Sequence, residues 1–293
     1  MRRLAGEGLA GALMTLPAAI AYLLLLLLPT LATVLLAFTD YELGTPALDW
    51  VGLGNFREML ADRGFGASVR NTLVYVGLVT PVSILGGLGL ALLVEAGARG
   101  RAFFRAVFFL PVVSLTVAMA AAWQYLLHPT IGPVNAALRA MGLGTPFWLS
   151  SSDTVLLSLA AIGVWESIGF NMVLFMAGLT AIPRELYAAA EVDGARGGYD
   201  RFRLVTWPLL GPTTLFVLTI SMIRSLRVFD TVAVLTQGGP NKASEVLLFT
   251  MYQQGFTYLR LGYSAAITLV FLAVVLALMW LQTRVLDRRV HYA

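Results

Sequence analysis

A single carboxylate, Glu166, stands inside a long apolar stretch of the chain, with Trp165, Ser167 and Asn171 close by. A carboxylate accepts hydrogen bonds from hydroxyl groups, an indole offers a flat ring face, and serine and asparagine both donate and accept. This mixture is typical of a site that binds a hydroxyl-rich solute. The same carboxylate also suits a structural bond to a neighbouring helix or a partner subunit, and the sequence leaves both interpretations open.

Three more charged residues, Arg224, Arg227 and Asp230, follow at intervals of three in a second apolar stretch. On a helix this spacing puts them on one face and permits an Arg227 to Asp230 ion pair. Either they pair locally and extend toward the membrane surface, or they line a vestibule for the solute. Two arginines suit a phosphate, but Asp230 and Glu166 balance their formal charge, so an uncharged sugar is slightly favoured.

The composition excludes several kinds of chemistry. The chain has no cysteine and two histidines, which excludes cysteine nucleophiles and thiolate metal sites. Its one lysine, Lys242, lies between Asn241 and Ala243, so the chain has no G-x-x-x-x-G-K-[ST] phosphate loop. Its 20 basic and 16 acidic residues are mostly spread over short loops, which does not indicate a nucleic-acid partner. We expect no catalytic residue, metal or cofactor in this chain.

Membrane-spanning helices must position these residues. Of the 293 residues, 58% are hydrophobic and 12% charged, and the mean hydropathy of +0.80 lies outside the range of soluble proteins. Crossing a bilayer takes roughly 20 apolar residues in a helix. The predicted fold class is an all-α polytopic membrane protein, one transmembrane domain over 1–293, with six spans near Leu13–Phe38, Thr72–Val94, Ala106–Leu127, Thr154–Leu179, Pro208–Val232 and Leu261–Val285.

The orientation follows from the distribution of lysine and arginine, which concentrate on the cytoplasmic side of membranes. With six spans, the side of the amino terminus receives twice as many of these residues as the opposite side. Both termini are therefore predicted to be cytoplasmic. The residues counted on that side are Arg2, Arg3, Arg99, Arg101, Arg105, Arg184, Arg196, Arg201, Arg203, Arg284, Arg288 and Arg289.

The 181–208 segment, between the fourth and fifth spans, is too patterned to be a simple connection. Pro183 suits the first position of a helix, the alanine-rich run favours helix, and Gly194 suits its end. After Gly197 and Gly198, apolar residues recur at intervals of three and predict a second short amphipathic helix. This cytoplasmic helix-turn-helix either lies on lipid headgroups or docks onto a cytoplasmic partner.

The run from Glu185 to Ala195, followed by Phe202 and Trp207–Leu210, resembles the EAA loop of ABC importer permeases. The resemblance is to the binding-protein-dependent sugar class, which includes maltose-type and glycerol-3-phosphate-type permeases. It covers nearly the whole chain. Further similar motifs, in the family's order, are Trp50–Phe56, Asn71–Leu73, Gly132 with Asn135, Leu138 and Gly142, Phe229–Asp230, Leu235–Pro240, and Tyr252 with Phe256.

The resemblance implies a permease subunit of an ATP-driven importer for a sugar or related polyol, multi-pass in the bacterial cytoplasmic (inner) membrane. Its implied partners are a second permease subunit, an ATPase dimer that carries ATP and magnesium, an extracytoplasmic solute-binding protein, a sugar-like solute and the lipid bilayer. Closure of the ATPase dimer would pull the EAA helices of the two permeases together. The spans would then change from an inward-open to an outward-open state.

The resemblance also implies which residues couple to the ATPase: Leu186, Ala188, Ala189, Ala190, Glu191, Asp193, Gly194, Ala195 and Phe202. The residues that we expect on the solute path are Glu166, Trp165, Asn171, Arg224, Arg227 and Asp230. Two features depart from the family pattern. Ala188 stands where the family usually has glutamate, and the stretch from Ala195 to Pro208 is one residue longer than usual.

Several other functions remain open at this point. The solute could be glycerol-3-phosphate or another phosphorylated polyol. An ion-coupled secondary transporter would also use a buried carboxylate, but it does not need the 181–208 segment, and no inverted repeat is visible. An intramembrane enzyme would need a nucleophile and a base, whereas His128 and His291 lie at a predicted helix end and in the tail. A non-transporting scaffold or receptor would leave Glu166 as an unexplained energetic cost.

Overall fold

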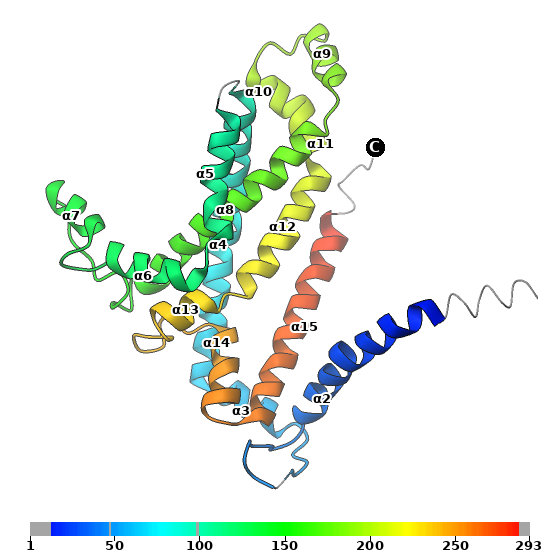
Figure 1. Ribbon diagram of the computed structural model, residues 1–293, viewed down its shortest axis with the longest axis vertical. Coiled ribbons are helices and arrows are strands. Elements are labelled where there is room, and N and C mark those ends of the chain that lie inside the picture. The colour runs from blue at the N-terminus through cyan, green and yellow to red at the C-terminus, as the bar shows by residue number, and fades with distance from the viewer. Residues whose placement is uncertain (1–12, 47, 98–99, 287–293) are drawn as a thin grey trace, which may run out of the picture. The chain divides into compact units, whose positions relative to one another are not determined.

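The computed structural model describes residues 13–46, 48–97 and 100–286, and in these ranges the chain is built from helices (Figure 1). The described residues contain one isolated β-bridge, between Thr39 and Trp50, and no strand. The predicted all-α class is therefore confirmed. Five arginines that enter the prediction of orientation lie outside the described residues: Arg2, Arg3, Arg99, Arg288 and Arg289.

The long apolar helices fall where the sequence predicts spans, but two of them are broken. By length and composition, the described residues contain four helices that can cross a membrane: Leu13–Leu36, α4 (Arg63–Ala96), α8 (Val155–Thr180) and Leu261–Gln282 within α15 (Leu261–Leu286). Two further pairs satisfy the same criteria only together, and each is bent. The pairs are α5 (Arg101–Val113) with α6 (Thr116–Leu126), at 100°, and Gly198–Leu209 with Gly211–Leu235, at 68°.

The chain divides into two compact units, which we describe separately. The first comprises Met1–Asp62 and Thr250–Ala273, and the second comprises Arg63–Phe249 and Val274–Ala293. Besides the long helices, the shorter elements are η1 (Leu23–Leu27), α2 (Leu28–Leu36), α3 (Gly54–Ala61), α7 (Pro133–Ala140), α9 (Arg184–Val192), α10 (Gly198–Arg201), η2 (Phe202–Thr206), α11 (Trp207–Leu209), α12 (Gly211–Leu226), α13 (Asp230–Leu235), α14 (Leu247–Tyr252) and η3 (Gln253–Thr257), where η marks a π-helical turn.

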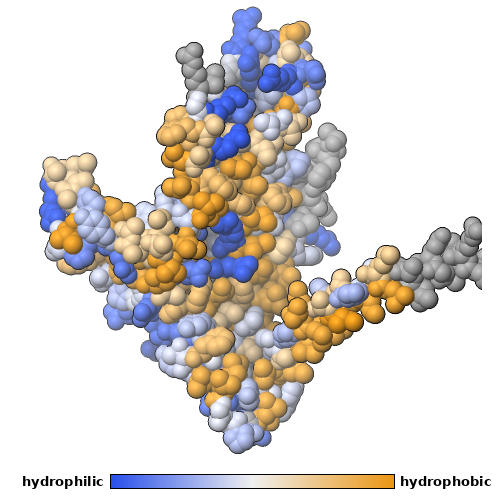
Figure 2. All heavy atoms as spheres, viewed as in Figure 1, coloured by the Kyte–Doolittle hydropathy of each residue, from blue (hydrophilic) through white to orange (hydrophobic). Residues whose placement is uncertain are grey.

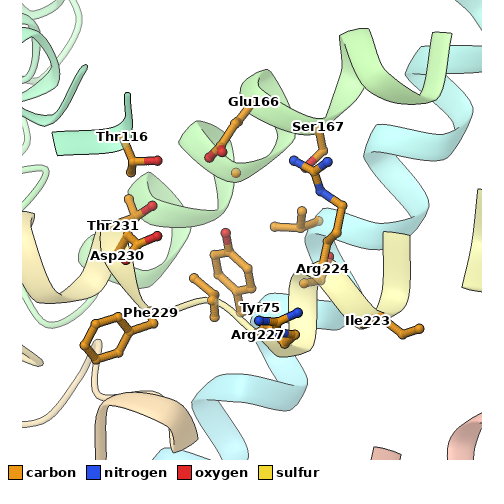
Figure 3. Close-up of a pocket in the computed structure, with 14 residues that line it drawn as sticks. Tyr75, Thr116, Glu166, Ser167, Ile223, Arg224, Arg227, Phe229, Asp230 and Thr231 are labelled. Carbon is orange, nitrogen blue, oxygen red and sulfur yellow. The ribbon is translucent and has the colours of Figure 1, made fainter. Parts of the chain in front are cut away.

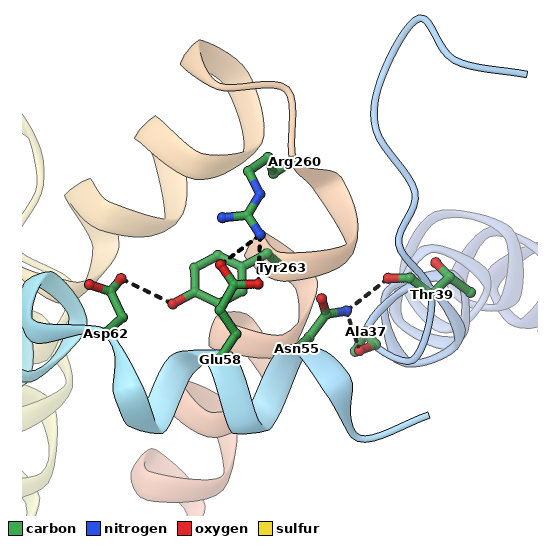
Figure 4. A network of polar contacts seen from close by, with 7 residues as sticks. All are labelled: Ala37, Thr39, Asn55, Glu58, Asp62, Arg260 and Tyr263. Atoms are coloured by element: carbon green, nitrogen blue, oxygen red, sulfur yellow. Dashed lines mark hydrogen bonds and ion pairs between the residues drawn. The ribbon is translucent and has the colours of Figure 1, made fainter. Parts of the chain in front are cut away.

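In the first unit, polar side chains hold segments that are far apart in the sequence (Figure 4). The buried Asn55 of α3 donates from Nδ2 to the carbonyl oxygens of Ala37, at 2.9 Å, and Thr39, at 2.8 Å. Arg260 forms an ion pair with Glu58 at 2.7 Å. Asn55 belongs to one of the motifs that carry the family resemblance, and here its role is to fix the loop that follows α2.

Helices α4, α8 and α12 form the interior of the second unit. Met172 and Phe175 on α8 are fully buried and pack in one hydrophobic cluster with Leu88 of α4 and Val217 of α12. A second cluster joins Tyr75 and Val79 of α4 to Leu159 of α8 and to Val232 of α13, among others. Helices α4 and α8 take part in both clusters, so together they form the centre on which the other helices pack.

Helix α5 packs against α8 at a glycine. A Cβ atom on Gly169 would overlap the backbone carbonyl of Phe108, so a larger residue cannot occupy this position without moving α5. Beyond Val113 the chain turns through Ser114 and Leu115 before α6 begins at Thr116. The continuous third span that the sequence predicts is therefore two helices at a steep angle.

The 181–208 segment consists of short helices. Pro183 precedes α9 in an extended conformation, and α9 ends just before Gly194, whose φ of +98° lies in the left-handed region that favours glycine. The second predicted helix begins at Gly198 and continues through Pro208 to Leu209 as α10, η2 and α11. In Figure 2 the surface over α9 and α10 is largely hydrophilic, whereas the surface over α5 is hydrophobic.

Candidate functional site

A pocket in the second unit brings together four charged residues of the predicted solute path. It has a volume of about 240 Å³ and is lined by Glu166, Arg224, Arg227 and Asp230, which we call the charged pocket. Glu166 lies near the middle of the 26-residue α8, Arg224 lies in the last turn of α12, and Arg227 and Asp230 follow that helix. The sequence places these four residues on the solute path in two separate apolar stretches, and the structure brings their side chains to one pocket.

A glycine on α8 makes room for a hydroxyl group beside Glu166. A Cβ atom on Gly163 would overlap the phenolic oxygen of Tyr75, which is 4% exposed and belongs to α4. Gly163 and Glu166 are three residues apart and so share one face of α8. Figure 3 shows the Tyr75 hydroxyl and the Glu166 carboxylate pointing into the same space. The pocket therefore presents a neutral hydroxyl next to its carboxylate.

Arg224 is held by an aromatic ring of the facing helix. Its guanidinium carbon lies 4.6 Å from the centroid of the Phe170 ring, a cation–π arrangement. Phe170 is four residues after Glu166 on α8, so one helix face supplies both a carboxylate and the aromatic ring that contacts Arg224. The half-buried Arg224 is thereby positioned in the pocket by a ring contact.

The four charged side chains of the pocket do not pair with one another. In the parts of the chain that the structure describes, none of Glu166, Arg224, Arg227 and Asp230 takes part in an ion pair. The Arg227 to Asp230 pair that the spacing permits is not formed, because α12 ends at Leu226 and α13 begins only at Asp230. The rule for residues three apart applies to a continuous helix and fails across this break.

Charges of opposite sign occupy different sides of the pocket. In Figure 3 the carboxylates of Glu166 and Asp230 lie on the side of Thr116 and Thr231, whereas the guanidinium of Arg224 lies beside Ser167. Carboxylates accept hydrogen bonds and guanidinium groups only donate them. A solute whose hydroxyl groups do both can therefore contact both sides, and the formal charges of the four residues cancel.

The structure places the other two predicted path residues differently. Trp165 lines a small cavity next to the charged pocket together with Glu166, and its ring meets that of Trp123 edge-on at 5.3 Å. Asn171 does not line the charged pocket, because its side chain is 1% exposed and is bonded to Ser83 and Ser221. Asn171 is thus separated from the group of residues with which the sequence associates it.

Most of the predicted coupling residues lie on the exposed side of the 181–208 segment. No residue of α9 is buried, although Ala190 and Tyr187 pack partly against the hydrophobic cluster of α4, α8 and α12. Of the predicted set, Ala195 is buried, Ala190 and Phe202 are half-buried, and the exposed members are Leu186, Ala188, Ala189, Glu191, Asp193 and Gly194. An exposed ion pair at 3.0 Å joins Glu191 to Arg201.

Sequence reasoning missed four residues that shape the pocket. Tyr75, Thr116, Phe170 and Thr231 come from four different helices and are neutral, so neither charge nor periodicity marks them. The described residues contain no cluster of three or more histidine, aspartate or glutamate side chains able to hold a metal ion. What the site offers is hydrogen bonding, an aromatic surface and balanced charge.

An all-α chain whose apolar helices line a charged pocket that also presents hydroxyl groups has the features of a multi-pass membrane permease. Residues 72–292 match the family model of the binding-protein-dependent transport system inner membrane component. The chain therefore belongs to that family, and the resemblance drawn from its motifs is confirmed. The family places it among inner-membrane proteins.

Individual relatives support the same assignment. The chain is 36% identical over 251 residues to the sn-glycerol-3-phosphate transport system permease protein UgpA of Agrobacterium fabrum, with 83% of each chain covered. It is 33% identical over 270 residues to the probable ABC transporter permease protein YurN of Bacillus subtilis, covering 91% of this chain and 92% of the relative.

The fold matches that of a solved transporter. A chain from the crystal structure of a bacterial ABC transporter that imports the acidic polysaccharide alginate superposes with a TM-score of 0.83. The alignment covers 98% of both chains at 24% sequence identity, so it establishes a shared fold.

Proposed function

We propose that this chain is a permease subunit of an ATP-driven importer for a sugar or a related polyol. The observation that carries the proposal is the charged pocket, where four charged side chains lie among apolar helices without ion pairs between them. Charged groups at membrane depth are costly and mark the paths of solutes. Glu166, Arg224, Arg227 and Asp230 would contact the solute, with Trp165 beside them.

The proposal also states how the chain crosses the membrane and which partner powers transport. Each bent pair counts as one span, which gives six spans in a single permease domain and leaves both termini in the cytoplasm, as the arginine distribution favours. The 181–208 segment then lies in the cytoplasm, where its exposed α9 docks onto an ATPase dimer that binds ATP and magnesium. A second permease subunit completes the path, and an extracytoplasmic solute-binding protein delivers the solute.

A phosphorylated polyol is a second candidate solute. Arg224 and Arg227 form no ion pair with another described residue, which leaves two guanidinium groups for a phosphate. The A. fabrum relative is a glycerol-3-phosphate permease by name. Competition for ATP-driven uptake by the complex decides between the two classes of solute. Neutral sugars should inhibit uptake if the solute is an uncharged sugar, and phosphorylated polyols should inhibit it if the solute carries a phosphate.

The test of the proposed function is uptake by the whole complex in liposomes. The chain is produced with its second permease, its ATPase and its solute-binding protein, and uptake is measured with and without ATP. Uptake should require ATP and the separate ATPase. Transport by this chain alone, or transport driven by an ion gradient, would contradict the proposal.

Glu166→Gln tests the pocket within that complex. The substitution removes one charge from the balanced set, and we expect uptake to fall at least about tenfold, or 1.4 kcal/mol, while the complex still assembles. Glu95→Gln is the matched control, because Glu95 is a helical carboxylate outside the pocket whose exposed ion pair with Arg101 contributes little. Equal uptake by both variants would remove Glu166 from the solute path.

A further inference from the structure

Three buried polar residues join the three helices at the interior of the second unit. The Nδ2 of Asn171 on α8 donates to Ser83 Oγ on α4 at 3.1 Å, and its Oδ1 accepts from Ser221 Oγ on α12 at 2.9 Å. The three side chains are 1%, 0% and 3% exposed, respectively. We call Ser83, Asn171 and Ser221 the Asn171 network.

Close helix packing surrounds this network. A Cβ atom on Gly87 of α4 would lie 2.6 Å from Cβ of Asn171, so glycine is required for the side chain to fit. Helices α8 and α12 also pack closely: a Cβ atom on Gly178 of α8 would lie 2.5 Å from Thr213 Oγ1 on α12. The helices therefore meet with little space between them.

The network lies between the two sites that a transporter must couple. Along α8, Asn171 follows Glu166 and precedes Thr180, the last residue of the helix before the 181–208 segment. Along α12, which begins just after that segment, Ser221 precedes Arg224 by three residues. At a rise of about 1.5 Å per residue, the network is within about 8 Å of Glu166 along α8 and of Arg224 along α12.

Separating α8 from α12 would carry an energetic cost. An unsatisfied polar group in a water-free membrane interior costs several kcal/mol, and a hydrogen bond between membrane helices contributes about 0.6 to 1.7 kcal/mol. Opening this contact would leave Asn171 Oδ1 and the Ser221 hydroxyl without each other. Motions that keep α8 and α12 together avoid that cost.

We propose that Asn171 is a positioning residue that holds α8 and α12 as one rigid body, so that a displacement of the 181–208 segment moves Glu166 and Arg224 together. This inference rests on the proposed function, since it concerns how movement of the 181–208 segment, caused by the ATPase, is transmitted to the charged pocket. It assigns the opening and closing of the pocket to walls outside the network, such as Thr116 of α6. It also removes Asn171 from direct contact with the solute.

Spin labels test the rigid body directly, because the chain has no cysteine of its own. Cysteines replace Ala177 on α8 and Phe216 on α12, both exposed, and the distance between labels is measured in the complete complex. We expect the same distance distribution without nucleotide and with ATP trapped. A second pair, Ala177 with the exposed Gln124 of α6, reports the motion of an element outside the network. A shift of several ångströms in the Ala177 to Phe216 pair would overturn the inference.

A pair of substitutions of equal shape tests the hydrogen bond. Ser221→Thr keeps a hydroxyl that can donate a hydrogen bond to Asn171 Oδ1, whereas Ser221→Val has a methyl group in place of that hydroxyl. We expect Val to lower the ratio of uptake to ATP hydrolysis about threefold to tenfold relative to Thr, as the loss of one interhelical hydrogen bond implies. A loss of packing alone would affect both variants equally and leave that ratio unchanged between them.

Ser158→Thr and Ser158→Val form the matched control. Ser158 is buried on α8, the helix of Asn171, but its hydroxyl bonds to the carbonyls of Trp148 and Thr154 and not to α4 or α12. These two variants should have the same ratio of uptake to ATP hydrolysis. If the wild-type complex couples hydrolysis to uptake but the two Ser221 variants behave alike, the positioning role is wrong. If the wild-type complex does not couple them at all, the proposed function itself fails.

Discussion

The interior of the second unit and the 181–208 segment differ in where their side chains find partners. In the interior, Asn171, Ser83 and Ser221 satisfy one another inside the chain. In the 181–208 segment, α9 buries no residue, and it leaves Leu186 and Val192 42% and 88% exposed. One region is complete as a single chain, whereas the other presents polar and apolar side chains that no described residue covers.

This difference separates two kinds of constraint on the sequence. Interior positions are constrained by contacts within the chain, so substitutions there act on folding and on the geometry of the pocket. Under the proposed function, positions on α9 are constrained by the ATPase that docks onto them, so substitutions there should leave folding nearly unchanged. The three predictions below test this division.

The largest effect is expected from Gly169→Ala in the interior. The added methyl group would overlap the carbonyl of Phe108, and overpacking of this kind costs about 1 to 3 kcal/mol. The matched control is Gly77→Ala in α4, where a Cβ atom meets nothing within 4 Å and helix propensity improves by up to about 1 kcal/mol. Thermal unfolding in detergent should show a lower midpoint for the first variant only. Equal midpoints would mean that α5 adjusts freely.

An intermediate effect is expected from Gly194→Ala in the 181–208 segment. Its φ of +98° costs a side chain about 1 to 2 kcal/mol, which should distort the end of α9 without unfolding the spans. Gly197→Ala is the control, since its φ of −166° suits any residue. We expect Gly194→Ala to reduce uptake per ATP hydrolysed severalfold while the thermal midpoint stays nearly constant. A large fall in the midpoint would break the division between the two regions.

The smallest effect on stability is expected from Glu191→Gln. Its ion pair with Arg201 is exposed, and such pairs contribute about 0.2 to 1 kcal/mol. The thermal midpoint should change little, and its difference from the wild-type chain should shrink further when salt is added, because salt screens an exposed pair. If binding of the purified ATPase nevertheless weakens, Glu191 contributes to docking and not to folding, which is the difference expected between α9 and the interior. Unchanged binding would remove Glu191 from the proposed docking surface.

Local pattern in the sequence was sufficient for the helical class and for several details. Apolar runs located the long helices, and Gly194 was identified as a helix end, where the structure has a left-handed residue. The charged members of the pocket stood out because charge is rare in apolar runs. These features depend on residues that are near one another in the chain.

Long-range geometry was not accessible in the same way. Pro111 inside α5 invites a kink, but the bend falls after it, at Ser114 and Leu115, and a proline does not predict a bend as steep as 100°. Asn171 was grouped with Glu166 because the two are close in sequence, whereas its partners are 88 and 50 residues away. In the first unit, Arg260 and Glu58 pair across 202 residues. Contacts of this kind are set by packing, which periodicity does not encode.

The charged pocket contains two arginines and two carboxylates, and this balance has an electrical consequence. Moving one elementary charge through a potential of 100 mV involves about 2.3 kcal/mol. A set of residues whose charges cancel displaces no net charge when it shifts across the field as a unit, so the voltage on the membrane neither drives nor opposes that shift. In the proposed importer, the work of each cycle is then determined by the ATPase and by whatever charge the solute itself carries.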